Sequence, residues 1–359
     1  MSIAGGRKSI PKPVALPKLG PGDRATLARE VYGPLPPAGA VCSTIVRIGV
    51  FGAAGRRASV AVAAGPVRID LAVYLPPGPP APVFFGSNFA GNSSIDPDPS
   101  IPPPGWLRPE HRGLARGAHA ERWPLDAILA RGFAAATWYD GDVCPDEPRL
   151  CAARGRELGG AFGAIALWAW GFSRVRAALA QTGLVQSGRA VAVGHSRHAK
   201  AAIWAAANDP AIAGAIANNS GAGGTRPFRW PEGETIAQLF DRFPHWFDPA
   251  LARFAGRERA LGTDQHAALA LVAPRPLYLA SAADDLWAGP DGEAWALRAI
   301  RHLWPDGAVG RHVRAGGHGI TRADWAKFLD FFDRALVPDA LRPNELRTPL
   351  ATRRRAKAD

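Results

Sequence analysis

Long apolar runs are missing from this sequence, and so is the apolar core of a secretory signal. No segment reaches the uninterrupted length that a membrane-spanning helix needs, although 47% of the residues are hydrophobic. The opening stretch from Met1 to Lys18 carries glycine, proline and lysine. We therefore expect a globular protein without membrane association. At face value we expect a cytoplasmic location, or a periplasmic or secreted one if a signal has been trimmed.

Cysteine is scarce, with three residues: Cys42, Cys144 and Cys151. Three cysteines do not make the disulfide framework of a small secreted scaffold, and no paired Cys/His spacing indicates a zinc site. Cys144 and Cys151 flank a short loop and could pair in an oxidising compartment, but free buried thiols are the simpler interpretation. We expect no bound metal.

Lysine is scarce as well. Only six of the 43 basic residues are lysine, so the formal charge of +12 comes mainly from arginine. The arginines are scattered, whereas a nucleic-acid-binding protein typically gathers its positive charges on one face or along one helix. We interpret the charge as a compositional bias and expect no nucleic-acid partner. We leave open that the positive charge creates an electrostatic field that attracts acidic substrates.

Strand-like apolar runs alternate with helix-like segments from about residue 82 onward, which predicts a mostly parallel, doubly wound sheet flanked by helices. Before this region, the period-two pattern over residues 58–73 predicts an antiparallel hairpin. We expect three regions. Residues 1–40 form an extended segment that wraps the surface, residues 41–340 form a single domain, and residues 341–359 form a basic, flexible tail.

The central motif combines a strand, a sharp turn and a helix. The apolar run of residues 190–193 ends at Gly194, Ser196 follows two residues later, and an alanine-rich segment with high helix propensity continues to residue 207. An α/β-hydrolase presents its nucleophilic serine in this context. The usual motif has a second glycine where this chain has His198, so the motif alone also fits an ordinary strand-to-helix turn.

A nucleophilic serine needs a base and a carboxylate that orients the base. Of nine histidines, His318 has the most suitable context, a glycine-rich loop between the last predicted strand and a C-terminal helix. Asp284 and Asp285 follow the strand predicted over residues 277–280, where an α/β-hydrolase places its acid. Such a pair can also cap a helix. The order serine, acid, histidine is that of α/β-hydrolases.

The same residues carry a resemblance to a known family. The segment 194–200, Gly-His-Ser-Arg-His-Ala-Lys, resembles the nucleophile motif of the glucuronoyl esterases, carbohydrate esterase family 15, and the match is closest to their bacterial branch. Further matching blocks follow in order over roughly residues 60–335: 88–92, 122–124, 219–224, 233–235, 243–247, 264–266, 280–288 and 314–318. The resemblance implies the α/β-hydrolase fold and an ester hydrolase that needs no metal or organic cofactor.

The resemblance also implies a role for each site residue. Ser196 is the nucleophile, His318 is the base, and Arg197 helps to stabilise the oxyanion together with backbone N–H groups. Three further residues stand at positions that bind the sugar: Lys200, Glu234 and Trp246.

Two positions depart from the family pattern. Ala199 replaces a glycine, which is a minor change. Asn219 stands where many members carry the glutamate of the triad, and an amide cannot stabilise the imidazolium by charge. We therefore expect Asp285, with Asp284 as the alternative, to complete the triad; without either, the site would be impaired.

The family implies a serine carboxylesterase that works through an acyl-enzyme and cleaves esters of glucuronic or 4-O-methylglucuronic acid, as in lignin–carbohydrate linkages. The partner is then a small-molecule or oligosaccharide ester, and we expect a monomer. Two alternatives stay open. One is another carbohydrate or small-molecule esterase on the same fold, such as an acetyl esterase, and the other is a non-catalytic carbohydrate-binding relative.

Overall fold

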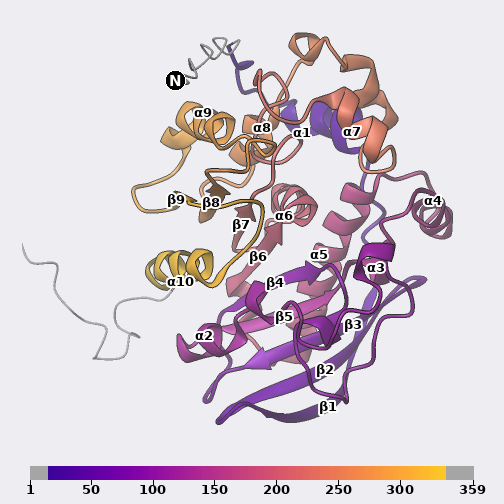
Figure 1. Ribbon diagram of the computed structural model, residues 1–359, viewed down its shortest axis with the longest axis vertical. Coiled ribbons are helices and arrows are strands. Elements are labelled where there is room, and N and C mark those ends of the chain that lie inside the picture. The colour runs from indigo at the N-terminus through magenta and orange to yellow at the C-terminus, as the bar shows by residue number, and fades with distance from the viewer. Residues whose placement is uncertain (1–14, 337–359) are drawn as a thin grey trace, which may run out of the picture.

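The computed structural model describes residues 15–336, which build a large sheet with helices on both faces (Figure 1). The strands of this sheet lie in the order β1-β2-β3-β5-β4-β6-β7-β8-β9. Strands β1 to β3 are antiparallel, β3 meets β5 antiparallel, and every later pair is parallel. The strand bounds are Val41–Phe51 (β1), Gly55–Ala64 (β2), Val67–Leu75 (β3), Val83–Asn88 (β4), Ala134–Tyr139 (β5), Ala190–His195 (β6), Gly214–Asn218 (β7), Leu277–Ala282 (β8) and Val309–Arg314 (β9).

Helices cover both faces of the sheet and create a hydrophobic core on each side. Neighbouring residues of β4 divide between the two cores, because successive side chains of a strand point to opposite faces. Phe84 packs edge-on against Trp325 of α10, whereas Phe85 packs against Phe172 of α5. The α-helix bounds are Asp23–Leu27 (α1), Leu125–Ala130 (α2), Asp140–Val143 (α3), Pro148–Glu157 (α4), Ala164–Thr182 (α5), Arg197–Asn208 (α6), Ile236–Arg242 (α7), Gln265–Ala270 (α8), Pro290–Ile300 (α9) and Arg322–Leu336 (α10).

This architecture confirms the predicted mostly parallel, doubly wound sheet, but its antiparallel part is larger than the predicted hairpin. Strand β1 pairs with β2 and forms one edge of the sheet. The side chains of Ile45, Val46, Ile48 and Val50 are all exposed. Without a buried face, β1 has no alternation of apolar and polar residues, and its sequence therefore lacked the signal that identified β2 and β3.

Helix α5 begins at Ala164, after a separate helix α4 that ends at Glu157. Gly159 adopts φ +85°, which interrupts the helical path between the two helices. No helix within residues 15–336 has both the length and the apolar character needed to cross a membrane. The predicted tail over residues 341–359 lies outside the described residues, as do residues 1–14.

Candidate active site

Ser196 occupies a strained turn between β6 and α6. Its backbone adopts φ +57° and ψ −129°, a conformation that non-glycine residues rarely take and that clusters at functional sites. Gly194 permits this turn, because a Cβ at that position would lie 2.2 Å from the carbonyl oxygen of His198. The N–H of Ser196 donates to the carbonyl oxygen of Asn218 (2.9 Å), which fixes the turn to the end of β7. The predicted strand, turn and helix are all present.

The candidate base and the first-choice acid are in direct contact. Nδ1 of His318 lies 2.6 Å from Oδ2 of Asp285, and the two residues come from the loops that follow the adjacent parallel strands β9 and β8. The side chain of Asp284 is exposed, and only its backbone N–H reaches the histidine loop, at the carbonyl oxygen of Gly316 (3.1 Å). Of the two candidate acids, the structure therefore brings Asp285 to the imidazole.

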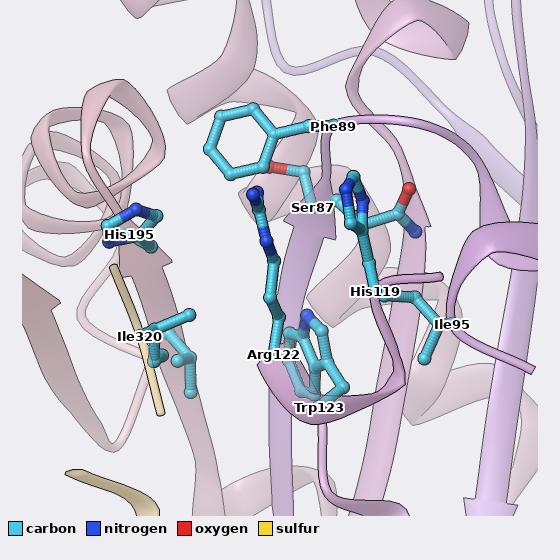
Figure 2. A pocket seen from close by; sticks show the side chains of 10 residues that line it. Ser87, Phe89, Ile95, His119, Arg122, Trp123, His195 and Ile320 are labelled. Atoms are coloured by element: carbon cyan, nitrogen blue, oxygen red, sulfur yellow. The ribbon is translucent and has the colours of Figure 1, made fainter. Parts of the chain in front are cut away.

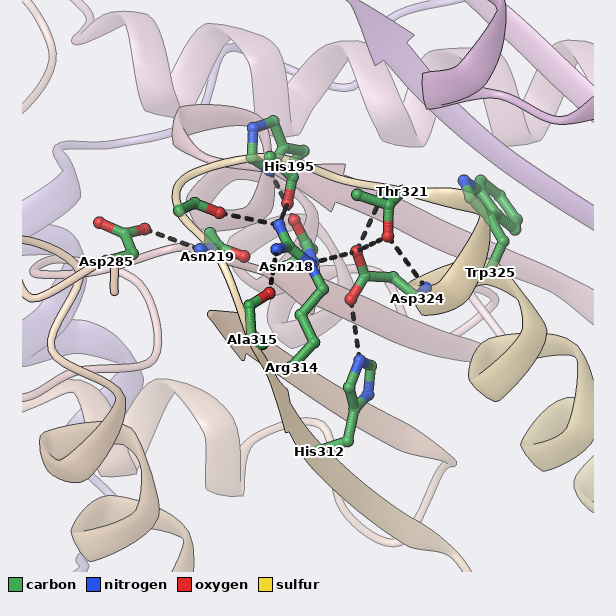
Figure 3. A network of polar contacts seen from close by, with 12 residues as sticks. His195, Asn218, Asn219, Asp285, His312, Arg314, Ala315, Thr321, Asp324 and Trp325 are labelled. Carbon is green, nitrogen blue, oxygen red and sulfur yellow. Dashed lines mark hydrogen bonds and ion pairs between the residues drawn. The ribbon is translucent and has the colours of Figure 1, made fainter. Parts of the chain in front are cut away.

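Asn219 contacts this acid from the neighbouring strand end (Figure 3). Its Nδ2 donates to Oδ2 of Asp285 at 2.7 Å, the same oxygen that His318 contacts, and the N–H of Ala288 donates to Oδ1 at 3.2 Å. Burial acts to raise the pKa of Asp285, but the hydrogen bonds from His318 and Asn219 outweigh it and hold the pKa below its ordinary value. Asp285 is therefore a carboxylate at neutral pH.

The loop that carries His318 is braced by an arginine from the end of β9 (Figure 3). The guanidinium of Arg314 donates to the carbonyl oxygens of Gly317 (2.8 Å) and Gly319 (2.9 Å) on either side of the histidine. Its Nε donates to Oδ2 of the buried Asp324 at 2.9 Å. These contacts of one planar group hold the loop in its conformation.

A second histidine packs beside the base. The rings of His195 and His318 have centroids 4.7 Å apart, and Nδ1 of His195 lies 2.6 Å from Oδ1 of Asn218. Since an amide oxygen only accepts, Nδ1 of His195 carries the proton. Burial is the main reason that the pKa of His195 lies well below its ordinary value, so the ring is neutral. Figure 2 shows this ring facing Arg122 across a small cavity of about 20 Å³, roughly the size of one water.

All seven first-choice site residues line one cleft of about 280 Å³. Several further lining residues were not identified from the sequence, and Trp287 is the most prominent of them. It follows Asp285 by two positions within the matching block 280–288, which was the signal that could have identified it. The full lining comprises Ser196, Arg197, Lys200, Asn219, Ser220, Gly221, Glu234, Arg242, Phe243, Trp246, Asp285, Trp287, Ala288 and His318.

The buried amine of Lys200 donates to the backbone carbonyl oxygens of Ser220 and Ala222. An ammonium group has three N–H donors, so one remains for a ligand in the cleft. Burial is the main cause that lowers the pKa of Lys200 to about 8. The cleft also contains a hydrogen-bond acceptor, the carboxylate of Glu234. Its Oε1 accepts a hydrogen bond from Nε1 of Trp287 at 3.0 Å.

Trp246 forms an aromatic wall of the cleft and is itself buried. Its ring stacks on Phe243 with a centroid distance of 3.8 Å and an interplanar angle of 3°. The side chain of Arg197 lies between Trp246 and Phe89, with its guanidinium carbon 5.5 Å and 5.0 Å from the two ring centroids. Both predicted residues therefore belong to one packed side of the cleft.

Within residues 15–336, no group of three or more histidine, cysteine, aspartate or glutamate side chains is arranged to hold a metal ion. Cys144 and Cys151 are buried, free thiols.

Comparisons with known proteins identify relatives of this chain. A family model described as "Glucuronyl esterase, fungi" matches residues 158–306. The carbohydrate esterase MZ0003, from an unknown prokaryotic organism, is 32% identical over 317 residues, which cover 76% of this chain and 72% of the relative. The 4-O-methyl-glucuronoyl methylesterase of Podospora anserina is 31% identical over 189 residues, 48% of this chain and 39% of its own length. The chain thus matches less than two thirds of the fungal relative.

A glucuronoyl esterase from Solibacter usitatus superposes with a TM-score of 0.82 at 33% identity, over 88% of this chain and 91% of that one. A promiscuous CE15 esterase from a marine bacterial metagenome gives a TM-score of 0.80 at 30% identity, over 87% and 90% of the two chains. Together with the prokaryotic relative, these structures confirm the α/β-hydrolase fold and the family predicted from the sequence blocks. This chain belongs to the glucuronoyl esterases, carbohydrate esterase family 15.

Proposed function

We propose that this protein hydrolyses carboxylic esters of glucuronic and 4-O-methylglucuronic acid through a covalent acyl-enzyme. The observation that carries the proposal is the contact between His318 and Asp285 in the cleft that Ser196 lines. A serine at a strained turn, an imidazole and a carboxylate in one cleft are the parts that acyl transfer needs.

In the first step Oγ of Ser196 attacks the ester carbonyl carbon, and Nε2 of His318 accepts the hydroxyl proton. The C–O bond to the alcohol then breaks, and the imidazolium gives its proton to the leaving alkoxide. Asp285, bonded to Nδ1, keeps Nε2 free as the acceptor and stabilises the positive charge that forms on the ring. Water, activated by the same imidazole, hydrolyses the acyl-enzyme and releases the uronic acid.

Arg197 and backbone N–H groups near the turn would stabilise the oxyanion of each tetrahedral intermediate. Lys200 and Glu234 offer one donor and one acceptor to sugar hydroxyls, and the aromatic rings of Trp246 and Trp287 supply apolar faces. Support for a uronate substrate comes from the name of the Podospora anserina relative, a 4-O-methyl-glucuronoyl methylesterase, together with these polar groups.

A substrate panel tests the proposal: benzyl glucuronate, methyl 4-O-methylglucuronate, acetylated xylan and p-nitrophenyl acetate. We expect the highest kcat/KM on the two uronate esters, and no turnover of any ester by Ser196→Ala. A higher kcat/KM on acetylated xylan would identify an acetyl esterase instead. Failure of the wild type to react with a serine-directed phosphonate would identify a non-catalytic relative.

A further inference from the structure

Asp146, in the loop between α3 and α4, joins four side chains around the cleft. Oδ1 accepts hydrogen bonds from Nε2 of His245 and from Nε1 of Trp246, both at 2.8 Å. Oδ2 pairs with Arg108 and lies 3.1 Å from Nε of Arg197. The carboxylate therefore touches two residues that line the cleft, although Asp146 does not line it.

The contact with Arg197 fixes the base of the guanidinium and leaves its outer nitrogens unengaged. Nε of Arg197 has no aligned hydrogen-bond acceptor within residues 15–336, so its contact with Asp146 is an ion pair and not a directed hydrogen bond. No described residue accepts a hydrogen bond from Nη1 or Nη2 either. With Phe89 and Trp246 on its flanks, the guanidinium is held by packing and by one charge while its donors stay available.

Asp146 is fully charged in this setting. Its side chain is only 1% exposed, and burial acts to raise its pKa. The hydrogen bond from His245 and the charge of Arg197 outweigh burial and bring the pKa far below its ordinary value. A buried carboxylate with several fixed donors keeps one position, which makes it a suitable anchor for a long, flexible side chain such as arginine.

We propose that Asp146 is the positioning residue for Arg197: it holds the guanidinium beside Ser196 so that the free N–H groups meet the oxyanion only in the transition state. The inference rests on the proposed function, because it takes Arg197 as the oxyanion-stabilising group. The loss of one oxyanion donor typically lowers kcat by about 10²–10³-fold. If Arg197 is displaced but still present, kcat should fall by part of that factor.

The test compares Asp146→Asn with a matched control, Asp96→Asn. Asp96 also forms a buried ion pair, with Arg57 at 3.0 Å and both side chains 5% exposed, but it does not line the cleft. We expect Asp146→Asn to lower kcat by about tenfold or more while KM changes less than about twofold. In the Arg197→Ala background the same substitution should cause no further loss. The control should keep kcat near that of the wild type.

An equal loss in both backgrounds, or a change confined to KM, would overturn the proposal, because Asp146 would then act on stability or through Trp246. If Asp146→Asn does not fold, Asp146→Glu replaces it in the same cycle, since it keeps the charge and moves the carboxylate. The labelling rate of Ser196 with a serine-directed phosphonate provides a second readout that is independent of ester specificity. Because the phosphonate contains no sugar, its labelling rate tests the positioning role of Asp146 even if the proposed uronate substrate is wrong.

Discussion

Asn219 and Asp285 are joined by a 2.7 Å hydrogen bond in which the amide donates to the carboxylate oxygen that also contacts His318. Many family members carry a glutamate where this chain has Asn219. In this chain the negative charge is that of Asp285, which follows β8. The amide of Asn219, which follows β7, donates a hydrogen bond to it. The amide at position 219 is therefore a direct hydrogen-bond partner of the acid.

Replacing Asp285 with asparagine should keep the geometry but remove the charge that stabilises the imidazolium. We expect kcat to fall by about 10⁴-fold, as when the acid of a serine-protease triad becomes an amide. Asp284→Asn is the matched control, because that side chain is exposed, and it should retain a near-normal kcat. Steady-state kinetics on a uronate ester check both, and near-normal rates for Asp285→Asn would show that the acid lies elsewhere.

Asn219→Ala removes one of the donors that lower the pKa of Asp285, so its effect should be far smaller than that of Asp285→Asn. Asn219→Glu, combined with Asp285→Asn, places a carboxylate back on the neighbouring strand end. We expect this double variant to regain part of the lost kcat. The measurement is kcat of the double variant against kcat of Asp285→Asn alone. Equal values would mean that a carboxylate at position 219 cannot reach the imidazole.

The pKa of about 8 predicts a pH effect on sugar binding by Lys200. Below pH 8 the ammonium has three N–H donors, and above it the neutral amine has two, which the carbonyl oxygens of Ser220 and Ala222 already use. We expect KM for a uronate ester to rise as the pH passes through about 8. KM for p-nitrophenyl acetate, which has no sugar hydroxyls, should stay flat over the same range. Parallel rises on both substrates would refute a role in sugar recognition.

Arg314→Gln should loosen the loop that carries His318, because it removes the donors to the carbonyl oxygens of Gly317 and Gly319. We expect a lower kcat with little change in KM, since the sugar-facing side of the cleft is untouched. Arg314→Lys, which keeps the charge but not the planar fork, should recover only part of the loss. Steady-state kinetics of the two variants and the wild type test this role of Arg314. An unchanged kcat in Arg314→Gln would mean that the loop keeps its conformation without these hydrogen bonds.

The sequence was informative where local chemistry fixes the structure. The turn at Ser196 could be predicted because Gly194 and the adjoining alanine-rich helix define it within a few residues. Asp146 could not, because its contact with Arg197 joins positions far apart in the chain and no local pattern marks a loop aspartate as buried. Strand β1 could not be predicted either, because its apolar residues are exposed and do not alternate with polar ones. Trp287 lay inside a recognised block, and its position two residues after Asp285 was the one sequence signal that it lines the cleft.

The ends of β7 and β8 lie side by side, and this adjacency matters for how relatives of this chain are recognised in sequence collections. A search that required an acidic residue at position 219 would discard this chain as inactive, although a carboxylate from the next strand contacts the same imidazole. A filter that accepts an acid at either strand end would retain it. Sequences set aside as degenerate on the basis of one missing glutamate merit inspection at the position of Asp285.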